Sequence, residues 1–571
     1  MKYLIFLLFC PTILLSQHIS EFFSVEPTFQ TTDFKFPATH TFQVLIAAGD
    51  PLTSGGTLNP NNDFTGYIPT VGNTRGVLGI NAEMPTGSVA KLSVKFTSSV
   101  GWEVLSSTQS FLPEVGGTMT NCSGHVTGWG NLITCEENII FDVNGDGYND
   151  AGWCIEIDQA TWKPVNYAGG LPNGDKIWQM GCMKHENVVI HSNGQTCYFG
   201  ADSDPGYLYK YVADVAQNLG SGNLYVYKEL TATTGEWVQL PNKTPYDQNR
   251  TIFLSDSVGA KVFQRVEDVE ISPVDGKIYF AVTAEGVVYR MTDTPFGTTV
   301  SDLEIYFGGQ NYDIFWGGGT TSVYGCIGAD NLAFDDLGNL WVCQDGDNNY
   351  IWVVKQGHTQ STPDVEVFGI VPAGAEPTGM TFTPDYQYCF MSIQHPNTTN
   401  NATTQLDAFG VPEAFDNSVS LVIARTENLG NALPIELIKF TGKKVDSGIQ
   451  LNWEIANAVN FSHFEIEKNG EAIGETVDDY FLDKSPNKGA NYYRLKMVDL
   501  DGSFNWSKTI NILFESSDLV ISPNPNDGIF TVNSEEYQIF DFQGKEVFQP
   551  LLKGIYFIKA GNQMKKIVVL K

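Results

Sequence analysis

The sequence has little positive charge. Its 571 residues include 33 Lys and Arg against 65 Asp and Glu, which gives a net charge of -32, and only 17% of the residues are charged. A surface that binds nucleic acid would have to be a local exception to this balance, so we expect no nucleic-acid partner. A hydrophobic content of 42% argues against a disordered chain and allows a large core.

Long hydrophobic runs are missing beyond the first residues. Lys2 precedes an apolar run over 3–15, and Ser16 follows it, as in a secretory signal peptide. We predict a signal peptide over 1–16, cleaved near Ser16, with a lipoprotein signal at Cys10 as the alternative. No later stretch approaches the roughly 20 apolar residues of a membrane span. The sequence therefore predicts export without a membrane span, to the cell surface or the medium.

Cysteine is scarce, and none occurs after residue 389. No two cysteines have the CxxC spacing of a zinc or redox site. An even number in an exported chain permits disulfides, so we expect structural bridges or buried thiols. Without Cys10, the cysteines are Cys122, Cys135, Cys154, Cys182, Cys197, Cys326, Cys343 and Cys389.

A helical period is also missing from every long segment. Alternation of the strand type dominates, as over 277–282 and 340–343, and 56 Gly with 26 Pro indicate many turns. A polar turn before an aliphatic and aromatic strand recurs near Gly194, Gly276 and Gly338. Its irregular spacing favours propeller blades with insertions over a solenoid. We predict an all-β chain with a β-propeller over 17–430.

The composition changes after about residue 430, where short alternating strands follow. The length of 433–515 suits a small β-sandwich, and its segments 450–453 and 491–495 resemble fibronectin-type or immunoglobulin-like modules.

The last segment, 518–571, contains Ser522-Pro-Asn-Pro-Asn-Asp-Gly528, then Lys553-Gly-Ile-Tyr556 and the terminal Lys571. In this order they resemble the sorting domain of the type IX secretion system of Bacteroidetes. The resemblance implies a small β-sandwich that is recognised by the type IX secretion machinery.

The most distinctive stretch lies over 117–138. It contains Asn121-Cys122-Ser-Gly124, Trp129-Gly130 and Cys135-Glu136-Glu137-Asn138. In this order the motifs resemble the signature of the PhoX-type alkaline phosphatase family. Further matches in the family's order are Gly49-Asp50-Pro51, Asn81-Ala82-Glu83, His185-Glu186, Arg265-Val266-Glu267-Asp268, Asp330-Asn331 and the segment from Glu376 to Pro396. The resemblance implies a β-propeller that hydrolyses phosphate monoesters with calcium and iron in a central funnel.

A physical argument supports the metal independently of the family. Calcium needs six to eight oxygen ligands, which a propeller supplies only where acidic side chains from several blades converge on its axis. Acidic and amide residues next to predicted strand ends are the expected ligands: Glu83, Glu136, Glu137, Glu186, Glu267, Asp268, Asp330, Asn331 and Glu376. For any one of them, a solvated surface carboxylate is the alternative.

Phosphoester hydrolysis needs cations that neutralise the phosphoryl oxygens, and no Ser-His-Asp arrangement offers another route. Arg265 is the expected phosphate clamp, because a guanidinium matches two phosphate oxygens; a salt bridge to a neighbouring carboxylate is the alternative. His395 is expected to orient phosphate or a metal ligand, with a structural histidine as the alternative.

One position departs from the family. Asn187 follows Glu186 where, in our alignment, the phosphatases carry the cysteine that bridges two irons. Asparagine cannot supply a soft, anionic bridge, so the sequence favours calcium and leaves iron doubtful. A calcium-stabilised propeller that binds a surface ligand without catalysis is therefore the alternative function.

A second calcium signal lies over 142–150. Asp142, Asn144, Asp146 and Asp150 stand at positions 1, 3, 5 and 9 of an EF-hand-like loop, with Gly147 at position 6. The usual glutamate at position 12 is missing. We predict one structural calcium here, with a metal-free turn rich in Asp and Asn as the alternative.

Overall fold

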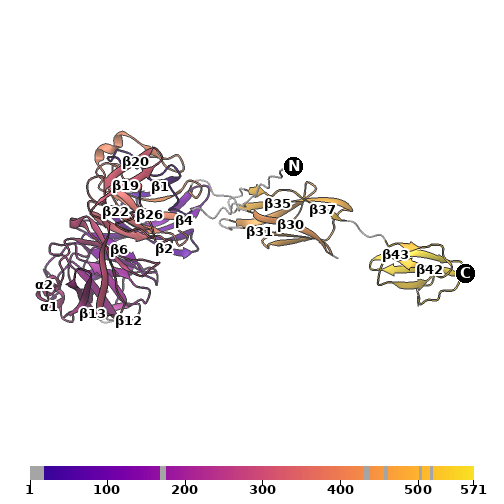
Figure 1. The fold of residues 1–571 in the computed structure, drawn as a ribbon, viewed down its shortest axis with the longest axis horizontal. Coiled ribbons are helices and arrows are strands. Elements are labelled where there is room, and N and C mark those ends of the chain that lie inside the picture. Colours follow the sequence, from indigo (N-terminus) through magenta and orange to yellow (C-terminus); the bar gives the residue numbers. More distant parts are fainter. Residues whose placement is uncertain are drawn as a thin grey trace, which may run out of the picture. The chain divides into compact units, whose positions relative to one another are not determined.

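The computed structural model describes residues 18–167, 175–429, 437–445, 447–455, 461–499, 504–514 and 519–571. The chain divides into two compact units, Met1–Leu433 and Pro434–Lys571. Strands dominate both units (Figure 1), so the prediction of an all-β chain with a propeller followed by β-sandwich modules is confirmed. The predicted signal peptide lies outside the described residues, and the finer domain limits stay predictions.

The first unit is a six-bladed propeller. In its described residues, four four-stranded sheets form blades A, B, E and F, and one nine-stranded sheet forms blades C and D. We count the nine-stranded sheet as two blades because β14 and β18 join its halves through only two residue pairs. Each blade is an antiparallel meander, which fits the short strands and frequent turns of the sequence.

The strands of blades A to C are β2 (Asn62–Val71), β3 (Arg75–Ala82), β4 (Ser88–Thr97) and β5 (Gly101–Ser110); β6 (Asn121–Val126), β7 (Leu132–Glu136), β8 (Cys154–Asp158) and β9 (Lys163–Pro164); and β10 (Val189–Ile190), β11 (Thr196–Gly200), β12 (Leu208–Val215), β13 (Asn218–Thr231) and β14 (Thr234–Leu240).

Those of blades D to F are β15 (Val266–Ile271), β16 (Ile278–Val282), β17 (Val287–Thr292) and β18 (Thr299–Gly308); β21 (Ala329–Phe334), β22 (Leu340–Gln344), β23 (Tyr350–Val354) and β24 (Val365–Ile370); and β25 (Glu376–Phe382), β26 (Tyr388–Gln394), β29 (Val419–Arg425) and β1 (His40–Ala47).

Both faces of a blade are buried, which explains the nearly continuous apolar runs of the inner strands. On β22, Leu340 and Val342 pack into a core shared with blade D, whereas Trp341 and Cys343 pack into a core shared with blade F. Side chains alternate across a strand, so a strand between two blades is apolar at every position.

The ring closes by pairing the two ends of the first unit. β1 lies antiparallel to β29 and completes blade F. Where blade F meets blade A, Gly379 has a φ of +63, and a Cβ there would lie 2.5 Å from the backbone oxygen of Asp63. Glycine is therefore required for this close approach.

Several short elements are inserted between the blades or between strands of one blade. They are helices α1 (Pro245–Gln248) and α2 (Thr251–Ser257), the hairpins β19 (Asn311–Trp316) with β20 (Gly319–Tyr324) and β27 (Gln405–Leu406) with β28 (Pro412–Glu413), and the 3-10 turns Pro113–Val115, Trp178–Met180, Thr283–Glu285 and Thr398–Ala402. No helix in the described residues is long and apolar enough to cross a membrane.

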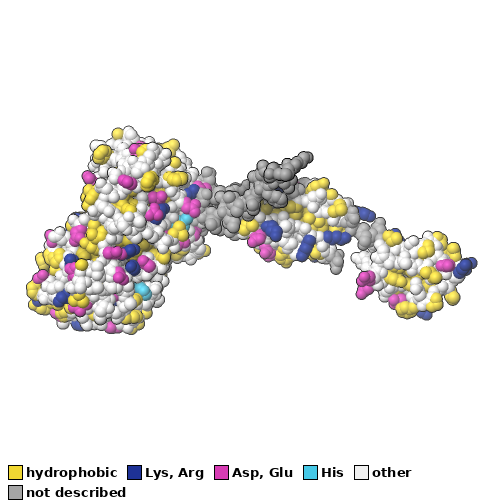
Figure 2. Space-filling model, viewed as in Figure 1, with side chains coloured by type: hydrophobic (Ala, Val, Ile, Leu, Met, Phe, Trp, Pro, Cys, Tyr) yellow, Lys and Arg dark blue, Asp and Glu magenta, His cyan; other side chains and the backbone are white. Residues whose placement is uncertain are grey.

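The second unit contains two further groups of strands, each with its own core. Trp453, Phe464 and Tyr493 lie in the first core, and Ile539, Ile558 and Ile567 lie in the second. Figure 2 shows hydrophobic side chains on the visible surface of the C-terminal group. The exposed hydrophobic residues of this group include Phe542, Phe548 and Leu552.

The strands of the first group are β30 (Leu437–Val445), β31 (Gly448–Ile455), β32 (Phe461–Lys468), β33 (Glu471–Thr476), β34 (Tyr480–Asp483), β35 (Gly489–Asp499), β36 (Phe504–Trp506) and β37 (Ile510–Phe514). Those of the second are β38 (Ile521–Ser522), β39 (Thr531–Val532), β40 (Gln538–Asp541), β41 (Glu546–Val547), β42 (Gly554–Ala560) and β43 (Gln563–Val569).

Candidate metal centre

The register of the two innermost strands brings acidic residues together at one end of each blade. In blade A, Asn62 pairs with Ala82, and the next residues are Asp63 and Glu83. Because the strands are antiparallel, the beginning of the first strand and the end of the second lie side by side.

The same arrangement recurs around the ring. Asn121 pairs with Glu136 in blade B, His185 with Ala201 in blade C, and Ala329 with Gln344 in blade E. The residues that follow these pairs are Cys122 with Glu137, Glu186 with Asp202, and Asp330 with Asp345.

A β-bulge lies at this position in at least four blades. The register shifts between Asn62 and Thr65 in blade A and between Asn121 and Gly124 in blade B. Equivalent shifts occur after Val266 in blade D and after Ala329 in blade E. A bulge changes the direction of the side chains within it, which explains how two successive side chains here contact different partners.

Residues at this end of every blade contribute to a continuous row of possible metal ligands. Four groups of three residues have ligand atoms within 4.8 Å of one another, and each group shares a member with the next. We call the nine residues the carboxylate row: Asp63, Glu83, Cys122, Glu137, Glu186, Glu267, Asp330, Asp345 and Glu376. All six blades supply at least one of them.

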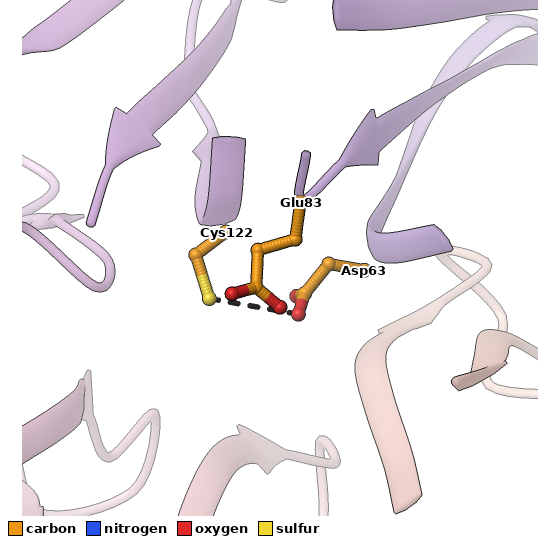
Figure 3. A group of neighbouring side chains, drawn as sticks. All are labelled: Asp63, Glu83 and Cys122. Carbon is orange, nitrogen blue, oxygen red and sulfur yellow. Dashed lines mark hydrogen bonds between the residues drawn. The ribbon is translucent and has the colours of Figure 1, made fainter. Parts of the chain in front are cut away.

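Cys122 lies within this row and not in the apolar core. Figure 3 shows its thiol, the carboxylate of Glu83 and that of Asp63 pointing toward one another. The sulfur lies 3.1 Å from Glu186 Oε1 and 3.5 Å from Asp63 Oδ2, so its one proton can be donated to either carboxylate. One soft sulfur ligand is therefore available among eight hard carboxylates.

Burial and mutual repulsion oppose the ionisation of the row. Burial, followed by the charge of Glu83, raises the pKa of Asp63 to about 7. Burial also raises the pKa of Glu137 to about 9 and that of Glu376 to about 10, with neighbouring acidic groups adding to both shifts. The pKa values of Glu186, Glu267 and Asp330 are raised well above their ordinary values for the same reasons. A cation bound here would favour the ionised carboxylates.

Six of the predicted ligands belong to the row: Glu83, Glu137, Glu186, Glu267, Asp330 and Glu376. Sequence reasoning missed Asp63, Cys122 and Asp345 as ligands. Asp345 comes two residues after the end of a strand predicted over 340–343, so the rule of acidic residues at strand ends could have found it. Cys122 stands in the distinctive motif, but without a CxxC spacing it was expected to be a structural bridge or a buried thiol.

In blades C, D and E the residue after the row member has a different function, because its side chain holds the next blade. Asn187 accepts a hydrogen bond from Val269 N and donates one to Val269 O, both at 3.0 Å. Asp268 accepts from Leu332 N at 2.7 Å, and Asn331 accepts from Gly379 N at 2.7 Å. We call Asn187, Asp268 and Asn331 the interblade latches. None of them belongs to the four ligand groups.

Asn187 therefore lies outside the row. The thiol in the row comes from Cys122, on a different blade.

Glu136 is also held away from the row. Lys176 Nζ contacts both of its carboxylate oxygens, at 2.8 and 2.9 Å, and both side chains are buried. The backbone N–H groups of Met119, Gly152 and Trp153 donate to the same oxygens. These contacts give Glu136 a structural role, because they join it to the loop between β7 and β8.

Residues 142–147 of the loop over 142–150 are exposed, whereas Asn149 is buried, and the side-chain oxygens of the loop accept backbone hydrogen bonds. Asp142 accepts from Gly145 N and Gly147 N, Asn144 from Asp146 N, and Asp146 from Tyr148 N. Asp150 accepts from Val143 N. These residues form no ligand group under the spacing that defines the row, and calcium in this loop stays a prediction.

Three half-exposed basic side chains lie at the edge of the row. Arg265 is 48% exposed and contacts Asp202 at 2.7 Å and Glu267 at 2.8 Å. Lys184, which was not predicted, is 41% exposed and lies 3.5 Å from Glu137. His395 is 46% exposed and lies 3.6 Å from Glu376. We call these three residues the rim cations, with His395 counted for its protonated form.

Comparisons with known proteins agree with this geometry. Residues 92–397 match the family model described as alkaline phosphatase PhoX. A search among curated proteins found no match.

Among solved structures, Pseudomonas fluorescens PhoX in complex with vanadate, a transition state analogue, is similar with a TM-score of 0.56 and 20% identity, over 72% of this chain and 98% of that one. The calcium-binding protein regucalcin from Agrobacterium tumefaciens has a TM-score of 0.34 and 12% identity, over 66% and 93% of the two chains. The first likeness supports the propeller fold. Since the family model covers more than half of the 571 residues, the chain belongs to the alkaline phosphatase PhoX family.

Proposed function

We propose that this chain is a metal-dependent phosphatase that hydrolyses phosphate monoesters, with calcium bound in the carboxylate row. The row itself is the observation that carries the proposal. Its eight carboxylates offer enough oxygen atoms for more than one calcium ion at six to eight ligands each. Family membership supports the same activity, and the related Pseudomonas PhoX is described with a transition state analogue bound.

Iron is part of the proposal at Cys122. A thiolate is a soft ligand that calcium does not need and that transition metals accept. Cys122, with Asp63, Glu186 and Glu137 nearby, would hold such an ion. Bound cations would supply Lewis-acid chemistry, by neutralising phosphoryl oxygens and lowering the pKa of a bound water.

The rim cations would receive the anionic substrate. Arg265 engages Asp202 and Glu267 through Nε and Nη2, so its Nη1 is left to donate to a phosphate oxygen. The two acidic partners fix the guanidinium in one orientation. Lys184 and His395 lie at the edge of the same row, at positions from which they would favour a doubly charged phosphate.

Phosphatase assays on the purified full chain test this proposal. We expect turnover of p-nitrophenyl phosphate that a chelator abolishes and that added calcium and iron restore. Glu186→Gln should remove most of the activity, whereas Glu103→Gln, an exposed change on β5, should not. A metal-loaded, folded chain without turnover would instead favour the alternative of a calcium-stabilised binding propeller.

We also propose that the chain is exported by the signal peptide at 1–16 and delivered by the type IX secretion machinery through 518–571. The separate core of the C-terminal strands supports a segment that folds by itself. In a host with this machinery, removal of 519–571 should leave the propeller in the periplasm. Unchanged delivery of the shortened chain would contradict this part of the proposal.

A further inference from the structure

A cavity lies along the innermost strands, next to the carboxylate row. It has a volume of about 320 Å³ and is lined by five of the six blades, A, B, D, E and F. Its lining begins at the residues after the row: Asp268 follows Glu267, and Glu270 stands two residues further along β15. At about 3.3 Å per residue, Glu270 is roughly 10 Å from Glu267 along the strand. The carboxylate of Glu270 is therefore separate from the carboxylate row, and the cavity extends away from the row.

The charge of this cavity excludes an anionic ligand. Among the described residues that line it, none is Lys or Arg, and two are acidic, Asp268 and Glu270. His125 also lines it, but burial lowers the pKa of His125 to about 4, which favours its neutral form. Asp268 is already engaged as an interblade latch, because its oxygens accept from Val269 N and Leu332 N. Glu270 makes no ion pair in the described structure, so its carboxylate is the group left to meet a ligand.

The small number of oxygen ligands in the walls also excludes a hard metal ion. A calcium ion would need six to eight oxygen ligands, and one free carboxylate does not provide them. The partly buried side chains around Glu270 include the aromatic rings of Phe334, Phe382 and Tyr386. Phe382 and Tyr386 lie against each other with ring centroids 5.6 Å apart.

We propose that this cavity binds a small organic cation of the alkylammonium class. Such a cation has an apolar surface that packs against aromatic rings and a positive charge that both a ring face and a carboxylate attract. A volume of about 320 Å³ lies at the lower end of ligand pockets and admits a molecule of a few heavy atoms. The proposal is independent of phosphatase activity.

Choline is the probe for the test, with 3,3-dimethyl-1-butanol as its neutral analogue of the same shape. Binding to the full chain would be measured by isothermal titration calorimetry in calcium-containing buffer, at constant chloride concentration. The pH would be about 9, because burial raises the pKa of Glu270 to about 8. We expect choline to bind about tenfold more tightly than the neutral analogue.

Two variants locate the binding. Glu270→Gln should weaken choline binding by about tenfold, and Phe382→Leu should weaken it several-fold, while Glu103→Gln on the outer strand β5 should leave it unchanged. Melting curves without choline would establish that each variant is folded. The proposal is overturned if choline does not bind, if it binds Glu270→Gln as well as the original chain, or if the neutral analogue binds equally. The two-ligand comparison needs no variant, so it decides even if Glu270→Gln does not fold.

Discussion

The thiol of Cys122 donates a hydrogen bond to Glu186 Oε1 at 3.1 Å, across the boundary between blades B and C. This contact places a sulfur atom inside a row of carboxylates that all six blades build. The β-bulge on β6 explains this contact, because the register shifts between Asn121 and Gly124 and a bulge changes the direction of the side chains within it, here Cys122 and Ser123.

Cys122→Ala should therefore remove iron from the protein and reduce kcat by about 100-fold or more, because the soft ligand is lost. Cys343→Ala, which removes a buried thiol from β22, is the matched control and should retain metal and activity. Iron content and phosphatase rate would be measured on both. Equal iron in the two variants would show that Cys122 is not a ligand.

Without divalent cations, the stability of the propeller should fall as the pH rises. The folded pKa values of about 7 for Asp63, 9 for Glu137 and 10 for Glu376 lie above the unfolded values near 4 to 4.5. The stabilisation from these raised pKa values is complete below the unfolded pKa and is lost as the pH rises through the folded pKa. Calcium should oppose this loss by binding the ionised carboxylates.

Melting temperatures of metal-depleted and calcium-loaded protein, measured between about pH 6 and about pH 9, test this expectation. The difference between the two forms should widen with rising pH. Parallel curves would mean that the row does not bind calcium.

Asn187→Ala should lower stability without changing the metal content. The substitution removes two hydrogen bonds from a buried side chain, at a cost of roughly 1 to 3 kcal/mol, although Val269 N still donates to Asp268 Oδ1. Denaturant unfolding and elemental analysis would be compared with Glu186→Gln, for which we expect the reverse pattern. Loss of metal from folded Asn187→Ala would restore Asn187 as a metal-site residue.

Lys184→Gln should raise KM by roughly three- to tenfold and change kcat little, because Lys184 attracts the substrate at the edge of the row. High salt should reduce the difference by screening the charge. Lys261→Gln is the control, since Lys261 is similarly exposed and pairs with Glu229 at 2.9 Å outside the row. A variant with an unchanged KM at low salt would exclude Lys184 from substrate binding.

The fold followed from the sequence because strand alternation and turn residues are local signals. Leu340 to Cys343 are apolar at every position, and this pattern alone predicts a strand buried on both faces. The ends of such strands also pointed to Glu137 and Glu186. By contrast, the sequence did not show which of two neighbouring residues joins the row and which contacts the next blade. Glu267 and Asp268 are neighbouring carboxylates, yet the first joins the row and the second holds blade E.

Contacts between residues that are far apart in the sequence account for the other differences between the predicted site and the structure. Glu136 and Glu137 stand together in the sequence, but Lys176, 40 residues away, binds the first of them. Asp63 lies in no motif that we recognised, and its partners come from three blades: Glu83 and Cys122 share its ligand group, and Thr378 of blade F donates a hydrogen bond to its Oδ1 at 2.8 Å. Such relationships depend on blade order and register, which composition and spacing do not contain.

Elemental analysis of the purified full chain, beside Glu186→Gln, tests the central claim most directly. After dialysis against metal-free buffer, the account predicts tightly held calcium and iron in the original chain and a clear loss of both in the variant. A folded original chain that retains neither metal would contradict it.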